Sequence, residues 1–159
     1  MTHTIINDYS TSTPSDRFYK IGWKQLFTDQ KRKVESNKPD MVIIGDSIAK
    51  GLMRYEDIWK TFDSFNTVNM GIGGDKCQHV LWRCQNINFP STVKYSVLIV
   101  GTNNIDSSSP NDIANSIIRI ALSLANENKN MRVIILGILP RDMDKNSIRR
   151  YKISECNDI

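Results

Sequence analysis

Short apolar runs alternate with amphipathic stretches along most of this 159-residue chain. The apolar runs have strand length, whereas the stretches between them repeat apolar residues at helical spacing. We expect strands at 41–44, 67–70, 95–100 and 131–139, and helices at 18–34, 48–62, 76–84 and from 109 onward. Strands that alternate with helices form a parallel sheet with helices on both faces. The predicted class is therefore α/β.

Composition excludes several classes of protein. Hydrophobic residues make up 40% of the chain and charged residues 24%, with a net charge of +4. The basic residues are scattered, so a solvated surface is favoured and no nucleic-acid partner is expected. No apolar run approaches the ~20 residues of a membrane span. The first residues lack a basic segment followed by an apolar one, so we expect no secretory signal. We expect a flexible lead-in at 1–15 and one domain at 16–159.

Cysteine usage points to a reducing compartment. The chain has three cysteines, of which Cys77 and Cys84 have the spacing of two turns on one helix face. An odd number of thiols without paired spacing favours free cysteines in a cytoplasmic protein. The cysteines and the two histidines form no ligand cluster, so we expect no metal and no cofactor.

Polar or glycine-rich turns follow three of the predicted strands, where parallel sheets bind ligands. Ser47 follows the first strand, in Gly-Asp-Ser; it is either a nucleophile or the cap of a helix. The glycine-rich turn 71–75 follows the second strand, and Asn103 follows the third. Glycine backbone N–H groups and an asparagine amide can bind an oxyanion, although each turn alone also fits an ordinary connection.

Together, the three turns resemble the block pattern of the SGNH (GDSL-type) hydrolases. The resemblance is greatest to the small catalytic subunits of brain-type platelet-activating-factor acetylhydrolase, over roughly residues 16–155. The shared motifs are Pro39-Asp40, Gly45-Asp-Ser47, Asn69-Met-Gly-Ile-Gly-Gly-Asp75, His79-Val-Leu-Trp-Arg83, Val100-Gly-Thr-Asn-Asn104 and Leu136-Gly-Ile-Leu-Pro-Arg141. The resemblance implies a flavodoxin-like SGNH fold.

The resemblance also implies residue roles. Ser47 matches the nucleophile, and the Gly74 N–H and the Asn103 side chain match the oxyanion hole. Asp46 matches a residue that orders the turn and is not the acid of the triad. His79 matches a histidine that is not catalytic in the family.

One family motif has no match in this sequence. The Asp-x-x-His block, which follows a fifth strand, supplies the acid and base of the triad. We therefore expect a domain that is incomplete at its C-terminus, lacks the last strand and helix, and is inactive alone. Three explanations stay open: part of a longer chain, a shortened paralogue, or completion by a second polypeptide.

The resemblance implies hydrolysis of a short-chain, acetyl-type ester of a lipid or other small molecule, through an acyl-serine intermediate. It also implies a homodimer and a beta-propeller partner. The alternative is a non-catalytic SGNH-fold binding module or truncated pseudoenzyme. A flavodoxin-like nucleotide binder is a third interpretation, which gives Ser47 and Asn103 no role.

Overall fold

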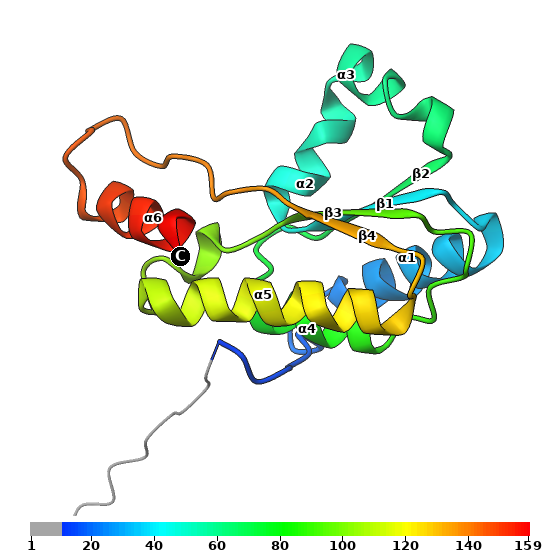
Figure 1. Cartoon of the computed structure of the whole chain (residues 1–159), viewed down its shortest axis with the longest axis horizontal. Helices are drawn as coiled ribbons and strands as arrows, with labels where there is room; N and C mark the ends of the chain where they lie inside the picture. The colour runs from blue at the N-terminus through cyan, green and yellow to red at the C-terminus, as the bar shows by residue number, and fades with distance from the viewer. Residues whose placement is uncertain (1–10) are drawn as a thin grey trace, which may run out of the picture.

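The computed structural model describes residues 11–159 and contains a four-stranded parallel sheet between helices (Figure 1). Its strands are β1 (Met41–Gly45), β2 (Thr67–Gly71), β3 (Tyr95–Ile99) and β4 (Arg132–Ile135). The strand order is β2-β1-β3-β4, and each neighbouring pair is parallel. The chain thus leaves β1 toward β2 on one side and returns to β3 on the other. Such a reversal opens a crevice at the carboxyl ends of the central strands, where ligands bind in open α/β sheets.

Helices cover both faces of the sheet, as the alternation of elements predicts (Figure 1). The helices α1 (Trp23–Asn37), α4 (Cys77–Gln85) and α5 (Pro110–Glu127) lie on one face. The short helices α2 (Ser47–Gly51) and α3 (Glu56–Lys60) lie on the other, and α6 (Ile148–Asp158) packs against α5. The expected α/β class is confirmed.

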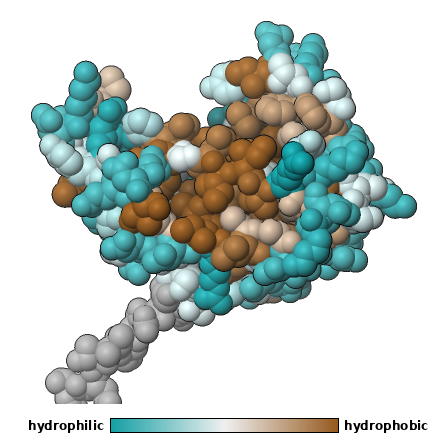
Figure 2. Space-filling model, viewed as in Figure 1, coloured by the Kyte–Doolittle hydropathy of each residue, from teal (hydrophilic) through white to brown (hydrophobic). Residues whose placement is uncertain are grey.

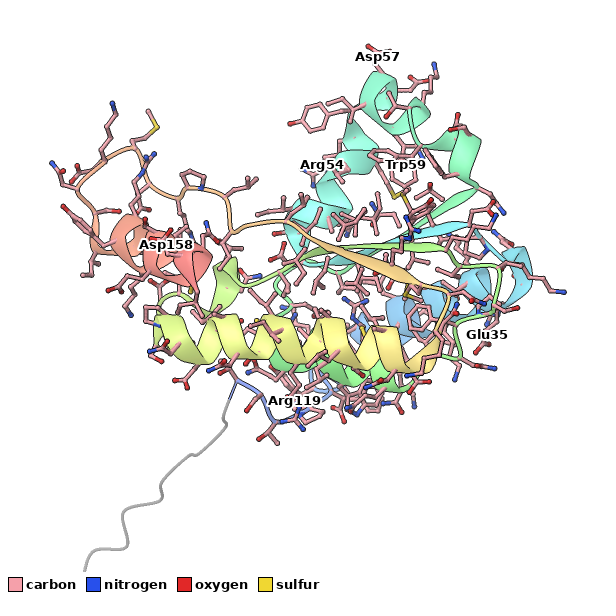
Figure 3. The ribbon with its side chains drawn as sticks, in the orientation of Figure 1. Glu35, Arg54, Asp57, Trp59, Arg119 and Asp158 are labelled. Atoms are coloured by element: carbon pink, nitrogen blue, oxygen red, sulfur yellow. The ribbon has the colours of Figure 1, made fainter. Side chains whose placement is uncertain are left out.

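Alternate strand residues divide the core into two parts. Val42 and Ile44 of β1 join the larger core beneath α1, α4 and α5, whereas Met41 and Ile43 join the smaller core beneath α2 and α3. Trp59 points from α3 toward the sheet and packs on the smaller core (Figure 3). Each of the five residues of β1 is buried, because this strand has neighbours on both edges and helices on both faces.

The prediction of a single helix at 48–62 is wrong. The chain forms α2, then a 3₁₀ turn at Leu52–Arg54, and then α3. Tyr55 separates the last two, with φ −105° and ψ 89°, outside the helical region. Glu56 and Asp57 follow in the first turn of α3, where acidic side chains favour a new helix start. The apolar residues across 48–62 have helical spacing, but they belong to two short helices and the turn between them.

The expected strand at 131–139 is too long. β4 ends at Ile135, although the Leu136 N–H still donates to Leu98 O at 3.0 Å. Beyond it, the side chain of Asn157 in α6 bonds the backbone of Ile138 twice: Oδ1 accepts from the N–H at 2.8 Å, and Nδ2 donates to the carbonyl at 3.0 Å. At Ile138, an amide side chain thus takes the place of a neighbouring strand as the hydrogen-bond partner of the backbone. The periodicity of the sequence does not reveal such a contact.

Part of the expected lead-in packs on the domain. Residues 1–10 lie outside the described part of the chain. Thr11 is buried, and its Oγ1 donates to Asp112 O at 3.4 Å. The Ser15 N–H donates to Gln78 O at 3.2 Å. Residues 11–15 therefore lie against α4 and α5.

Candidate active site

Ser47 begins α2, directly after the carboxyl end of β1. The preceding Asp46 caps this helix: its Oδ1 accepts from the Ile48 N–H at 2.8 Å, and its own N–H donates to Ile99 O at 3.2 Å. A Cβ on Gly45 would overlap that same carbonyl oxygen, so only glycine fits there. The turn is fixed on both sides, and it presents an exposed Ser47 at the edge of the sheet.

The glycine-rich turn after β2 passes beside Ser47. A Cβ built on Gly73 would lie 4.0 Å from the Ser47 Cβ. Gly74 has φ +76°, a left-handed conformation that glycine adopts at little cost. The Ile72 N–H donates to Gly45 O at 3.0 Å, which ties the turn to the end of β1. The structure thus places Gly73, which directly precedes the predicted donor Gly74, next to the predicted nucleophile.

The two asparagines after β3 have different surroundings. Asn103 is half-buried, and its Nδ2 donates to Asp75 O at 2.9 Å. That bond uses one of the two amide hydrogens. Asn104 is fully buried, and its Oδ1 accepts from the Cys77 N–H at 2.9 Å at the start of α4. The candidate oxyanion donor therefore lies against the glycine-rich turn, whereas its neighbour caps a helix.

A buried carboxylate anchors this turn. The Asp75 side chain is fully buried; its Oδ1 accepts from Trp23 Nε1 at 2.7 Å and from an Arg17 Nη at 3.0 Å. Its Oδ2 accepts from Arg83 Nε at 2.9 Å. Buried carboxylates need such charged and polar partners. Asp75 is thus bonded to two segments of the N-terminal region and to α4, while its carbonyl receives Asn103.

Arg83 joins the ends of the two adjacent strands. It is fully buried in α4, and its two Nη atoms donate to Met70 O at 2.8 Å and to Gly45 O at 2.9 Å, besides the bond to Asp75. Sequence reasoning assigned neither Arg83 nor Asp75 a role. The available signal was an arginine within the apolar run 80–84, since a charged residue at a core position requires buried partners.

Asp46 is a buried carboxyl with an unusual pKa. Its side chain is fully buried, and Oδ2 has no hydrogen-bond partner among the described residues. Burial is the main cause that raises the pKa of Asp46 to about 6; the charge of Asp75 acts in the same direction, and the bond from the Ile48 N–H opposes it. The carboxyl next to Ser47 therefore changes its charge in the mildly acidic range.

The stability of the fold is expected to depend on pH through this group. A carboxyl whose folded-state pKa lies above its unfolded value binds its proton more tightly in the folded protein. Its contribution is therefore greatest below about pH 4, falls between about pH 4 and 6, and stays low above that. We expect Asp46→Asn to remove this slope and to raise the free energy of unfolding at pH 7.5 by up to about 3 kcal/mol. Urea unfolding at several pH values measures both changes.

Asp57→Asn, which alters an exposed carboxylate of α3 (Figure 3), is the matched control. Equal slopes between pH 4 and 6 in wild type and Asp46→Asn would contradict the assignment.

His79 lies in α4 with its ring turned to the backbone. It is buried, and its Nδ1 accepts from the Lys76 N–H at 3.0 Å. Burial lowers the pKa of His79 to about 3, and the charges of Arg17, Lys76 and Arg83 act in the same direction. A ring with so low a pKa is a weak base. This agrees with the non-catalytic role that the resemblance gives it.

The three cysteines are free thiols, as expected, and Cys77 and Cys84 both lie in α4. Burial raises the pKa of each of these two to about 12, so neither is a ready nucleophile.

Among residues 11–159, no three metal-binding side chains gather into one site. Within the same range, no helix is long and apolar enough to cross a membrane.

The edge of the sheet at β4 is open. Ile134 and Ile135 are each 45% exposed, and Leu136 is 44% exposed. A cavity of about 330 Å³ lies between this edge, α5 and the end of α6. Figure 2 shows apolar side chains gathered in a hollow of the surface. Apolar side chains of the fourth strand therefore lack packing partners, whereas β1, β2 and β3 have no exposed residue.

The chain is similar to subunits of known acetylhydrolases. It is 37% identical over 157 residues to platelet-activating factor acetylhydrolase IB subunit alpha1 of Homo sapiens, covering 96% of this chain and 66% of that protein. It is 34% identical over 128 residues to subunit alpha2 of Homo sapiens, covering 79% of this chain and 54% of that protein. The chain thus spans about half to two thirds of the length of these relatives.

A solved structure supports the fold. A GDSL-like lipase from Bacteroides thetaiotaomicron superposes with a TM-score of 0.65 at 21% identity, over 83% of this chain and 71% of that one. No family model matches the sequence. The similarity to both acetylhydrolase subunits and the shared fold agree with the block pattern of the sequence. The chain belongs to the SGNH (GDSL-type) family of esterase-type hydrolases.

Proposed function

We propose that residues 16–159 form the nucleophile-bearing part of a serine esterase that hydrolyses short-chain, acetyl-type esters. The observation that carries the proposal is the meeting of Ser47, the glycine-rich turn and Asn103 at three neighbouring strand ends. Gly73 lies beside Ser47, and Asn103 bonds the carbonyl of Asp75 in the same turn. Such convergence of a serine with oxyanion donors is what acyl transfer requires.

In the proposed reaction, Ser47 Oγ attacks the ester carbonyl carbon while a base accepts the hydroxyl proton. The Gly74 N–H, the Ser47 N–H and the Asn103 amide hold the resulting oxyanion. The C–O bond to the alcohol then breaks, and the alcohol takes the proton from the base. Water attacks the acyl-serine by the same steps and releases the carboxylic acid. Each oxyanion donor of this kind contributes about 3 kcal/mol in known acyl-transfer sites.

The general base is proposed to lie on further polypeptide. Within residues 11–159 the one histidine is His79, whose Nδ1 is already an acceptor and whose pKa is lowered to about 3. The open edge at β4, with its exposed Ile134 and Leu136, suits an added strand. The relatives extend beyond the matched region. An added strand beside β4, followed by an Asp-x-x-His block, would supply the base at the end of the sheet where Ser47 lies.

The second candidate is a non-catalytic module that binds an ester, an acyl group or a protein. The absence of a suitable base among the described residues favours it. It predicts that Ser47 binds ligands without forming a covalent acyl intermediate. Detection of acyl-serine by mass spectrometry separates the two functions.

The substrate class is tested by acyl chain length. We expect hydrolysis by the full-length protein to be fastest for p-nitrophenyl acetate and to fall with butyrate, octanoate and palmitate. A binding module would give no turnover with any of the four. Faster turnover of octanoate or palmitate than of acetate would contradict the short-chain assignment, while leaving the esterase assignment in place.

Assembly and location form part of the same proposal. The curated relatives are named as subunits, and the family resemblance supports a homodimer with a beta-propeller partner. The free thiols at the three cysteines support a cytoplasmic location. Size measurement by light scattering, with and without a candidate propeller partner, tests the assembly.

A further inference from the structure

Arg17 contacts three consecutive residues of the glycine-rich turn with one guanidinium. One Nη donates to Gly73 O at 3.2 Å and to Asp75 Oδ1 at 3.0 Å. A Cβ built on Gly74 would lie 3.4 Å from both Nη atoms, so the guanidinium packs directly against that glycine. Arg17 lies outside the sheet and its helices, in the segment before α1. A residue distant in sequence therefore fixes the turn from its outer side.

The turn has other anchors, but they hold different atoms. Trp23 and Arg83 bond the side chain of Asp75, and the Asp75 N–H donates to Ile72 O at 3.2 Å. Among the contacts of the described residues, the bond from Arg17 is the one that reaches the peptide oxygen of Gly73. That oxygen belongs to the same peptide group as the Gly74 N–H. Whatever holds this carbonyl also sets the direction of that N–H, because the peptide group is planar.

We propose that Arg17 is a positioning residue for the oxyanion hole, aiming the Gly74 N–H through its bonds to the Gly73 carbonyl and to Asp75. This inference rests on the proposed function, in which the Gly74 N–H binds the oxyanion. One Nη donates both bonds while the second Nη also packs against Gly74, a planar contact that a lysine ammonium does not reproduce. The Arg17 side chain is 12% exposed. Its positive charge also favours the negative charge that develops at the turn.

The proposal is tested first without turnover. In Arg17→Ala, the backbone amide resonances of Gly74 and Asp75 should shift more than those elsewhere in a ¹⁵N NMR spectrum. Millimolar guanidinium should return them toward their wild-type positions, whereas urea should not. Arg32→Ala is the matched control, because Arg32 is an exposed arginine whose side chain pairs with Asp29 in the same helix. Unshifted Gly74 and Asp75 resonances in Arg17→Ala would overturn the proposal.

The second measurement is the rate of acetyl-ester hydrolysis by the full-length protein. Arg17→Ala should lower kcat by about 10- to 100-fold with little change in KM, because a displaced oxyanion donor affects the transition state. Arg17→Lys should recover only part of the rate, and guanidinium should rescue Arg17→Ala. Wild-type kcat in Arg17→Ala would overturn the positioning role. A wild-type protein without activity would refute the proposed function, while the NMR result would still decide whether Arg17 orders the turn.

Discussion

Replacing Ser47 by alanine is expected to reduce acetyl-ester hydrolysis by the full-length protein by about 10⁴- to 10⁶-fold. The hydroxyl oxygen of Ser47 is the one atom of the proposed site that forms a covalent bond to the substrate, so no neighbouring group replaces it. The oxyanion donors stay in place, since Gly74 and Asn103 are held by contacts that do not involve Ser47. A small residual rate above that of water is therefore expected.

The same substitution should leave the fold intact. The Ser47 side chain is exposed, and the cap of α2 is supplied by Asp46. We expect a change in the free energy of unfolding within about 0.5 kcal/mol. Ser64→Ala, at an exposed serine of the 3₁₀ turn Asp63–Phe65, is the control for both measurements. Retention of wild-type kcat by Ser47→Ala would remove the serine from the mechanism.

Replacing Arg83 by methionine is expected to destabilise the fold by about 3–5 kcal/mol. The substitution leaves the buried Asp75 carboxylate without its charged partner on Oδ2. It also leaves the carbonyls of Met70 and Gly45 without the donors that reach them from α4. Methionine fills most of the same space, so the loss comes from polar groups left unpaired. Urea unfolding at neutral pH measures the effect.

A double substitution separates the ion pair from packing. If the Asp75 charge accounts for most of the loss, adding Asp75→Asn to Arg83→Met should cost less than the sum of the two single changes. Arg119→Ala is the control, because Arg119 projects into solvent from α5 (Figure 3). Its effect should stay within about 0.5 kcal/mol. Additive losses, or an Arg83→Met variant as stable as Arg119→Ala, would show that the pair does not hold the strand ends.

The sequence predicts the strands of the sheet better than it predicts the connections between them. Buried strands such as 41–44 and 95–100 are recognisable because a parallel strand with helices on both faces must be apolar along its length. The carboxyl ends of such strands follow from the same pattern, so Ser47, Gly74 and Asn103 are expected at one end of the sheet. These inferences depend on local composition and chain order, which one sequence contains.

The remainder depends on contacts between distant residues. The end of β4 is set by Asn157, some twenty residues later, and the break at Tyr55 by a backbone conformation that apolar spacing does not encode. The roles of Arg17 and Arg83 likewise appear only when the N-terminal segment and α4 meet at Asp75. Charged residues at buried positions are signalled by the sequence, but their partners are not.

The nucleophilic role of Ser47 is tested most directly by covalent labelling of the full-length protein with a small fluorophosphonate, followed by mass spectrometry of its peptides. An activated serine displaces fluoride and forms a bond from Oγ to phosphorus. We expect a single adduct at Ser47, which disappears in Ser47→Ala and persists in Ser64→Ala. Hydrolytic activity that survives with no adduct at Ser47, or an adduct on a different serine, would exclude Ser47 as the nucleophile.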